Sequence, residues 1–305
     1  MDALLKLVQT VNGYLTDYVL IFLLVGTGLF FTIKTKFVQV RCFGEGMRKV
    51  FGNIKLRGGK NDSGLSPFQA LATAVAAQVG TGNIVGASGA ILTGGPGAIF
   101  WMWVIAFFGM ATIYAEATLA QETKVVKEDG SVLGGPVYYI KTAFKGGFGK
   151  FLAVFFAIAI ILALGFMGSM VQSNSIAGVV EKVLDPEKAN ILFSVGSYDV
   201  TLTAVIVGAI IALVAAFIFL GGIQRIASVT EKLVPIMAIL FLLGGVMVLS
   251  FNYRYILPTF GMIFKYAFTP QALIGGGIGA ALKIAISQGA KRGLFSNEAG
   301  MGSTP

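Results

Sequence analysis

The sequence predicts an all-α polytopic membrane protein, and three observations support this fold class. Apolar residues make up 56% of the 305 residues and charged residues only 12%, which is roughly half the charged share of a soluble domain. Apolar runs of about twenty residues recur along the chain, and this is the length that crosses the hydrocarbon core of a bilayer. The runs are too long and too uniformly apolar for barrel strands, which alternate in segments of about ten residues.

Six apolar spans follow from this pattern. They cover residues 14–33, 67–92, 97–121, 151–176, 201–220 and 226–250. After them, residues 252–270 interleave aromatic side chains with Arg254 and Lys265, which is typical of a segment in the membrane interface.

The connections between the spans differ in charge, and this difference predicts the orientation. Residues 34–62 carry eight basic and two acidic side chains, and residues 122–150 carry five and three. Residues 181–200 carry two basic and four acidic side chains. Because basic loops stay in the cytoplasm, we expect the first two connections to be cytoplasmic and the third external. The N-terminus then lies outside, and residues 251–270 fall outside despite their two cations.

Composition and motifs exclude several functions. The chain has no histidine, and Cys42 is its single cysteine, which removes disulfides, histidine acid–base chemistry and the common zinc and haem sites. Phosphate-loop, serine-triad and metal-ligand patterns are also missing, so we predict neither an enzyme nor a cofactor. Basic cytoplasmic loops explain the net charge of +9, so we predict no nucleic-acid partner. The first residues lack a basic region followed by a cleavage site, so we expect no cleaved signal peptide.

The first polar interruption is AAQVGTGNIVG, residues 76–86, inside the second span. Its polar side chains are Gln78, Thr81 and Asn83. One interpretation is that the helix unwinds here, because glycine weakens a helix interior and polar groups at membrane depth need partners. The other is close helix packing along the small face of Gly82 and Gly86. Spacing alone does not choose between the two.

Unwinding would give this stretch a chemical role. It frees backbone groups that no lipid can satisfy, so it is tolerated only where these groups face protein or a water-filled cavity. The freed N–H groups at the start of the second half-helix, with the positive end of the helix dipole behind them, suit a carboxylate. The freed carbonyls at the end of the first half suit a small cation.

Two more interruptions lie in later spans. FMGSMVQSNSIAG, residues 166–178, brings Gln172 and Asn174 to the outer end of the fourth span. Gln172 either faces the bundle interior and a polar ligand or marks an interfacial helix end, and the interfacial end is the preferred interpretation for Asn174. Glu116 is interpreted as a solvated residue near the cytoplasmic end of its helix, with a gating ion pair as the alternative.

The last interruption is GLFSNEAGMGSTP, residues 293–305. It repeats the composition of the first, with polar side chains followed by glycines: Ser296, Asn297, Glu298, Gly300 and Gly302. From the residues alone we favour a cytoplasmic loop that follows a helix over 271–290. Lys291 and Arg292 would be the basic flank of this loop.

Three stretches carry a resemblance to a known family. GGPGAIFWMWVIAFFG, residues 94–109, resembles the signature of the alanine or glycine:cation symporters, and VGTGNIVG and KRGLFSNEAGMGS resemble two further hallmark stretches. The resemblance implies a sodium-coupled carrier with the five-plus-five inverted-repeat (LeuT-like) fold. The implied organisation of the single transmembrane domain 1–305 is a leading helix at 14–33, a first five-helix repeat at 67–250, and an external segment with the start of the second repeat at 251–305.

The resemblance also implies functional residues, which would surround a substrate held between two discontinuous helices. The substrate-binding positions would be Thr81, Gly82, Asn83, Gln172, Ser296, Asn297 and Gly300, with the amides of Thr81 and Gly82 on the substrate carboxylate. The carbonyls of Ala76 and Val79 would line a sodium site, with Gln78 beside them. Sodium is the coupling ion, and no cofactor is implied.

The expected function is inward symport of alanine or glycine with sodium across the cytoplasmic membrane, by alternating access. The expected partners are the small amino acid and the bilayer, and the oligomeric state is open. The rivals are a channel lined by the glycines, a membrane-embedded enzyme, and a receptor that binds amino acids without transport. Because the family carries a complete second repeat, we expect this chain to be partial and not to transport alone.

Overall fold

The computed structural model describes residues 2–51, 67–128, 132–188, 190–196, 198–269 and 278–303. It is 83% helical. Five helices in these ranges are long and apolar enough to cross a membrane, and a bent pair of helices raises the number of spans to six. The structure therefore confirms a helical, multi-pass membrane protein.

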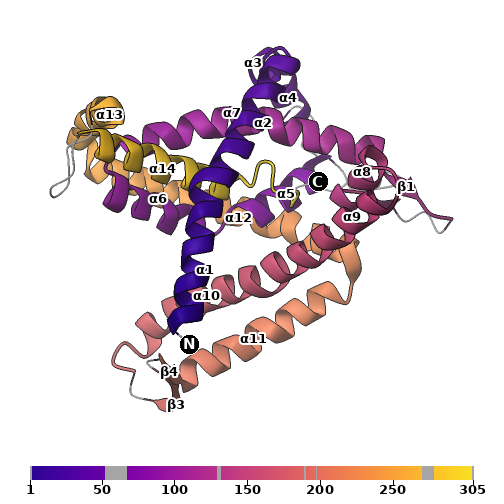
Figure 1. The fold of residues 1–305 in the computed structure, drawn as a ribbon. Coiled ribbons are helices and arrows are strands. Elements are labelled where there is room, and N and C mark those ends of the chain that lie inside the picture. Colours follow the sequence, from indigo (N-terminus) through magenta and orange to yellow (C-terminus); the bar gives the residue numbers. More distant parts are fainter. Residues whose placement is uncertain are drawn as a thin grey trace.

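The leading span is longer than predicted. Helix α1 (Asp2–Tyr14), a π-helical segment η1 (Leu15–Leu20) and helix α2 (Ile21–Lys34) form one continuous stretch, drawn in indigo in Figure 1. The sequence prediction began only at residue 14, because the polar side chains of the first thirteen residues lower the hydropathy without breaking a helix. Two short helices follow, α3 (Val38–Arg41) and α4 (Phe43–Phe51).

The second span is bent. Helices α5 (Pro67–Gln78) and α6 (Thr81–Gly94) meet at 47° across a break of two residues. Helix α7 (Gly97–Glu122) follows at once, since Gly95 turns the chain with φ +74°, a conformation that glycine adopts without steric cost.

The remaining spans occupy the lower part and the middle of Figure 1. Helix α8 (Pro136–Ala143) precedes one long helix made of α9 (Gly147–Ile160), η2 (Ile161–Gly168) and α10 (Ser169–Leu184). Helix α10 lies beside α11 (Leu202–Phe219) in the lower part of the figure, and α12 (Gly222–Phe251) follows and crosses its middle. The fourth span thus runs from 147 to 184 and not from 151 to 176. Its last turns are polar, which hid them from a hydropathy pattern.

Two β-hairpins lie in the connections and were not predicted. Strands β1 (Val125–Val126) and β2 (Val132–Leu133) pair antiparallel, as do β3 (Ile191–Val195) and β4 (Tyr198–Thr201). These strands have two to five residues, too few for an alternating pattern to stand out.

Helix α13 (Tyr253–Phe268) packs across the first half of α7. The indole Nε1 of Trp101 donates to the carbonyl of Ala267 at 3.0 Å. A Cβ on Gly97 would lie 2.1 Å from the carbonyl oxygen of Tyr266, so only glycine permits this approach.

Helix α14 (Ile278–Asn297) lies against α6 and α7 and contradicts one prediction. The expected helix end before Lys291 is wrong, because the helix continues to Asn297. Gly293 does not break it, since the position serves close packing: a Cβ there would lie 3.3 Å from Met102. The buried centre of this region consists of Ile105, Ala290 and Leu294, with Ile21, Leu24 and Val25 packed on it.

Candidate functional site

The break in the second span leaves a backbone carbonyl without its helical partner. Gly80 has extended dihedrals, φ −144° and ψ −173°. In a continuous helix its N–H would donate to the carbonyl of Ala76, but here it donates to Oδ1 of Asn83 at 2.9 Å. The structure thus contains the predicted unwinding, and it frees the Ala76 carbonyl, one of the two carbonyls expected to line a cation site. Val79 lies in the break, and Gln78 ends α5.

The packing interpretation also holds, for Gly86 but not for Gly82. A Cβ on Gly86 would lie 3.4 Å from Cδ of Arg292, and one on Gly94 would lie 3.2 Å from Cβ of Gln288. Gly82 differs, because a Cβ there would meet no atom within 4 Å. Gly86 and Gly94 therefore face α14, whereas Gly82 faces open space in the first turn of α6.

Asn83 joins the break to the end of α14. Its Nδ2 donates to the backbone carbonyl of Ser296 at 3.0 Å and to the hydroxyl Oγ of Ser296 at 2.8 Å. The same side chain accepts the N–H of Gly80. One amide therefore holds together two helix termini that are far apart in the sequence.

Helix α10 supplies a third side of the break. The hydroxyl of Thr81 donates to Oγ of Ser175 at 3.2 Å. A Cβ on Gly80 would lie 2.6 Å from Nε2 of Gln172, so the Gln172 amide faces the break. An interfacial helix end is therefore wrong for Gln172, because the helix continues to Leu184. Sequence reasoning missed Ser175, although it lies three residues after Gln172 on the same helix face.

After Ser296, the end of α14 contacts α7 and α2 and not the break. Oδ1 of Asn297 accepts the N–H of Ala299 at 3.0 Å, and a Cβ on Gly109 would lie 2.9 Å from its Nδ2. Gly300, with φ +82°, lies instead against Leu24 of α2. The structure thus gathers the predicted residues Thr81, Asn83, Gln172 and Ser296 around the break. It places Asn297 against α7 and Gly300 against α2.

Glu116 is buried, so the prediction of a solvated helix end is wrong. Its Oε2 accepts the N–H of Gly300 at 3.0 Å, and its Oε1 accepts the N–H of Gly302 at 3.2 Å. The turns that follow α14 expose backbone N–H groups that lipid cannot satisfy, and the carboxylate satisfies two of them. Burial raises the pKa of Tyr139 on α8 to about 12, and the carboxylate of Glu116 adds to this effect.

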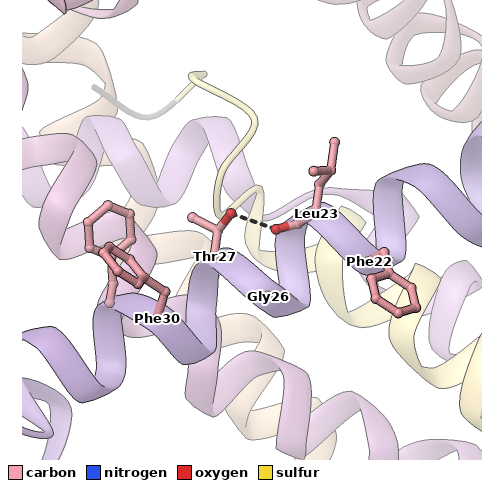
Figure 2. A pocket seen from close by; sticks show the side chains of 6 residues that line it. Phe22, Leu23, Gly26, Thr27 and Phe30 are labelled. Atoms are coloured by element: carbon pink, nitrogen blue, oxygen red, sulfur yellow. Dashed lines mark hydrogen bonds between the residues drawn. The ribbon is translucent and has the colours of Figure 1, made fainter.

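A groove on the outer face of α2 offers no competing site. It is lined by Phe22, Leu23, Gly26, Thr27, Phe30 and Phe31 (Figure 2). The hydroxyl of Thr27 already donates to the carbonyl of Leu23 at 2.5 Å. An amino acid would find only apolar side chains of one helix here, whereas the break offers amides, hydroxyls and a free carbonyl.

Comparison with known proteins finds one matching family model and several relatives. A sequence model described as "Sodium:alanine symporter family" matches residues 1–305. The sodium/alanine symporter AgcS of Methanococcus maripaludis is 42% identical over 98% of this chain and 62% of its own length. An uncharacterized transporter of Haemophilus influenzae is 42% identical over 100% of the chain and 58% of its own length. The amino-acid carrier protein AlsT of Bacillus subtilis is 40% identical over 98% of the chain and 58% of its own length. The chain thus spans about three fifths of the length of these relatives.

Proposed function

Because this chain belongs to the sodium:alanine symporter family, we propose that it carries the first part of the site for sodium-coupled symport of alanine or glycine across the cytoplasmic membrane. The family is a transporter family and not an enzyme family. The observation that supports the proposal best is the broken second span, whose open end faces Gln172 and the end of α14.

The substrate carboxylate binds at the start of α6. The N–H groups of Thr81 and Gly82 belong to the first turn, where the helix dipole favours an anion. The open space beside Gly82 leaves room for a carboxylate. Asn83 lies next to the substrate and fixes the first turn of α6 by donating to the hydroxyl of Ser296.

The substrate ammonium lies toward α14 and α10. The oxygen atoms of Ser296 and Gln172 are the acceptors there, and an ammonium group requires acceptors. We assign no ligand role to Asn297, because its Oδ1 already accepts the N–H of Ala299. We assign no ligand role to Gly300, because its N–H is occupied by Glu116. Its left-handed backbone instead shapes the turn after α14.

Sodium binds at the last turn of α5. The free carbonyl of Ala76, the carbonyl of Val79 and the side chain of Gln78 supply oxygen ligands, as a hard cation requires. Because sodium would sit at the negative end of the α5 dipole and the carboxylate at the positive end of α6, each ligand stabilises the conformation that binds the other. Linkage then makes the two affinities rise together.

Alternating access follows from the five-plus-five inverted-repeat fold, which we propose for the complete protein. The five spans from α5 to α12 would be the first repeat and α14 the start of the second, with the N-terminus outside. Two interrupted helices whose ends meet at one site are the expected mark of such a carrier. The break between α5 and α6, which Asn83 joins to the end of α14, supports this proposal.

The test is uptake of labelled alanine by the complete protein in proteoliposomes with an inward sodium gradient. We expect labelled alanine to accumulate, and this accumulation to disappear when choline replaces sodium. Unlabelled glycine should compete with labelled alanine for uptake. Alanine binding without accumulation would instead identify a receptor. Currents far above carrier turnover, without fixed stoichiometry, would identify a channel.

A variant tests the site separately from the function. Gly82→Leu places a side chain where a Cβ meets nothing within 4 Å, so the fold tolerates it while the carboxylate position is blocked. We expect uptake to fall at least about tenfold. Gly89→Leu is the matched control, because Gly89 also lies on α6 with open space around it. Equal uptake by the two variants would show that the site assignment is wrong.

A further inference from the structure

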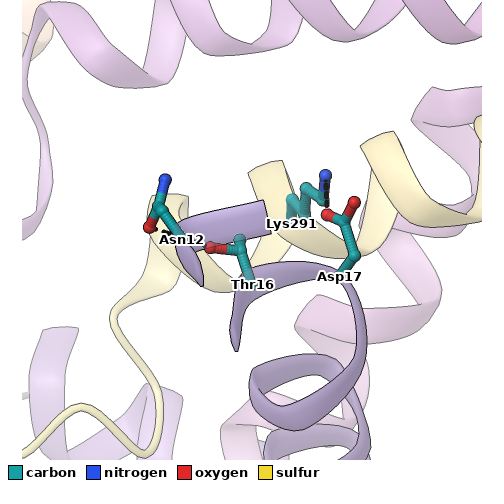
Figure 3. A network of polar contacts seen from close by, with 4 residues as sticks. All are labelled: Asn12, Thr16, Asp17 and Lys291. Atoms are coloured by element: carbon teal, nitrogen blue, oxygen red, sulfur yellow. Dashed lines mark hydrogen bonds and ion pairs between the residues drawn. The ribbon is translucent and has the colours of Figure 1, made fainter. Parts of the chain in front are cut away.

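An ion pair joins the leading helix to α14. The carboxylate of Asp17, in the π-helical segment η1, contacts the ammonium of Lys291 (Figure 3). The two residues belong to segments at opposite ends of the sequence. Among the described residues, the other ion pair joins Lys49 and Glu45 one turn apart on α4, where both side chains are more than half exposed.

Both charges lie within apolar segments. Asp17 is near the middle of the continuous stretch Ala3–Lys34, about 25 Å along the helix from Lys34 at a rise of 1.5 Å per residue. The side chain of Lys291 is 20% exposed and that of Asp17 39%. A lone charge at such depth is costly in a membrane, so residues of this kind occur with a partner.

The neighbouring polar groups do not replace this pairing. The hydroxyl of Thr16 donates to Oδ1 of Asn12 at 3.3 Å, one turn away on the same helix (Figure 3). Lys6 of the leading helix is exposed. Asp17 is therefore the group that the structure places against the Lys291 ammonium.

Lys291 and the proposed site share one helix. Ser296 follows Lys291 by little more than one turn, and Asn83 donates to its hydroxyl at 2.8 Å. Without Asp17, the Lys291 ammonium would seek water, as long basic side chains do in membranes, and would draw α14 along its axis. A shift of about 1 Å breaks the bond between Asn83 and Ser296, because hydrogen bonds tolerate only a few tenths of an ångström.

We propose that Asp17 is a positioning residue of the transport site: it neutralises Lys291 and so holds α14 at the depth where Ser296 meets Asn83. The leading helix, which lies outside both repeats of the proposed fold, thereby becomes part of the site. The location of the site rests on the proposed function, but the contact between α14 and α6 does not.

The first experiment is a neutralisation cycle in the complete protein, read as the KM and maximal rate of sodium-driven alanine uptake. Asp17→Asn and Lys291→Gln each leave one charge unpaired, so we expect each to raise KM about tenfold. The double variant removes both charges, and we expect its KM within about threefold of the wild type, because replacing both members of an ion pair inside apolar segments is far less disruptive than removing one. Lys6→Gln, which removes an exposed charge from the same helix, is the control and should not change KM.

The second experiment measures the helix contact without transport. In a Cys42→Ser background, Asn83→Cys and Ser296→Cys form an oxidisable pair, and we expect Asp17→Asn to slow its cross-linking at least about fivefold. Adding Lys291→Gln should restore the rate. The pair Thr81→Cys with Ser175→Cys is the control, because it joins α6 to α10 and should cross-link equally in every background.

Two outcomes would overturn the proposal. One is an unchanged KM together with an unchanged cross-linking rate in Asp17→Asn. The other is a double variant as impaired as the single ones, since the pair would then act by something other than neutralisation. If the wild type shows no sodium-driven uptake, the proposed function fails, while the cross-linking experiment still decides the role of Asp17.

Discussion

Gly80→Ala is the sharpest perturbation of the candidate site. The new Cβ would lie 2.6 Å from Nε2 and 3.3 Å from Oε1 of Gln172, so the Gln172 amide must move away from the break. The backbone itself accepts alanine, because Gly80 has extended dihedrals that any residue adopts. The substitution therefore acts on the position of one side chain and not on the break.

The expected loss follows from the bond that Gln172 would make. A hydrogen bond to a charged group contributes about 1.5–3 kcal/mol, and each 1.4 kcal/mol changes an affinity about tenfold. If Gln172 binds the charged end of the amino acid, displacing it raises KM by about 10- to 100-fold. The maximal rate should change less, because the break and the α14 contact remain.

The assay is sodium-driven alanine uptake with Gly89→Ala as the matched control, since a Cβ at Gly89 meets no atom within 4 Å. Adding Gln172→Ala completes a double-mutant cycle. In a Gln172→Ala background, Gly80→Ala should have no further effect on KM. A KM for Gly80→Ala equal to that of the control, or fully additive effects in the cycle, would refute the placement of Gln172 beside the substrate.

Two further predictions concern the buried carboxylate and its neighbour. Glu116→Gln replaces one of the two oxygens that accept the N–H groups of Gly300 and Gly302 by an NH₂ group, which leaves a buried donor unsatisfied. We expect a loss of about 1–3 kcal/mol in unfolding free energy, measured as a lower melting temperature. Glu122→Gln, at an exposed position, is the control and should show no such loss. The raised pKa of Tyr139, about 12 against about 10 in an unfolded chain, means that the folded state retains this proton longer. Stability should therefore be complete below pH 10 and fall between about pH 10 and 12, and Tyr139→Phe should remove that part of the decline in a series of alkaline melting curves.

The helix break could be recognised as one of two interpretations of the sequence, because its causes are local. Gly80 and Gly82 weaken the helix within a few residues, and Asn83 lies three positions after Gly80, the spacing at which a side chain can bond the N–H of the residue before a helix. The same stretch could not reveal its partners. Ser175 and Ser296 reach the break only through the packing of α10 and α14, and sequence spacing carries no information on that packing.

A charged residue in an apolar segment predicts less: that the residue has a partner, but not which partner. The depth of Glu116 and of Lys291 in their segments requires that each find a partner, but the rule does not say which group this is. Glu116 is satisfied by two backbone N–H groups, which have no side-chain signature, so the sequence suggested solvent instead. Lys291 pairs with Asp17 of the leading helix. Here a list of the charged residues in apolar segments would have reduced the number of candidate partners. A carboxylate in one apolar segment and an ammonium in another lower each other's free-energy cost in the membrane when they pair. Such a pair is informative about the fold because it brings together two helices that hydrophobic periodicity alone leaves unconnected.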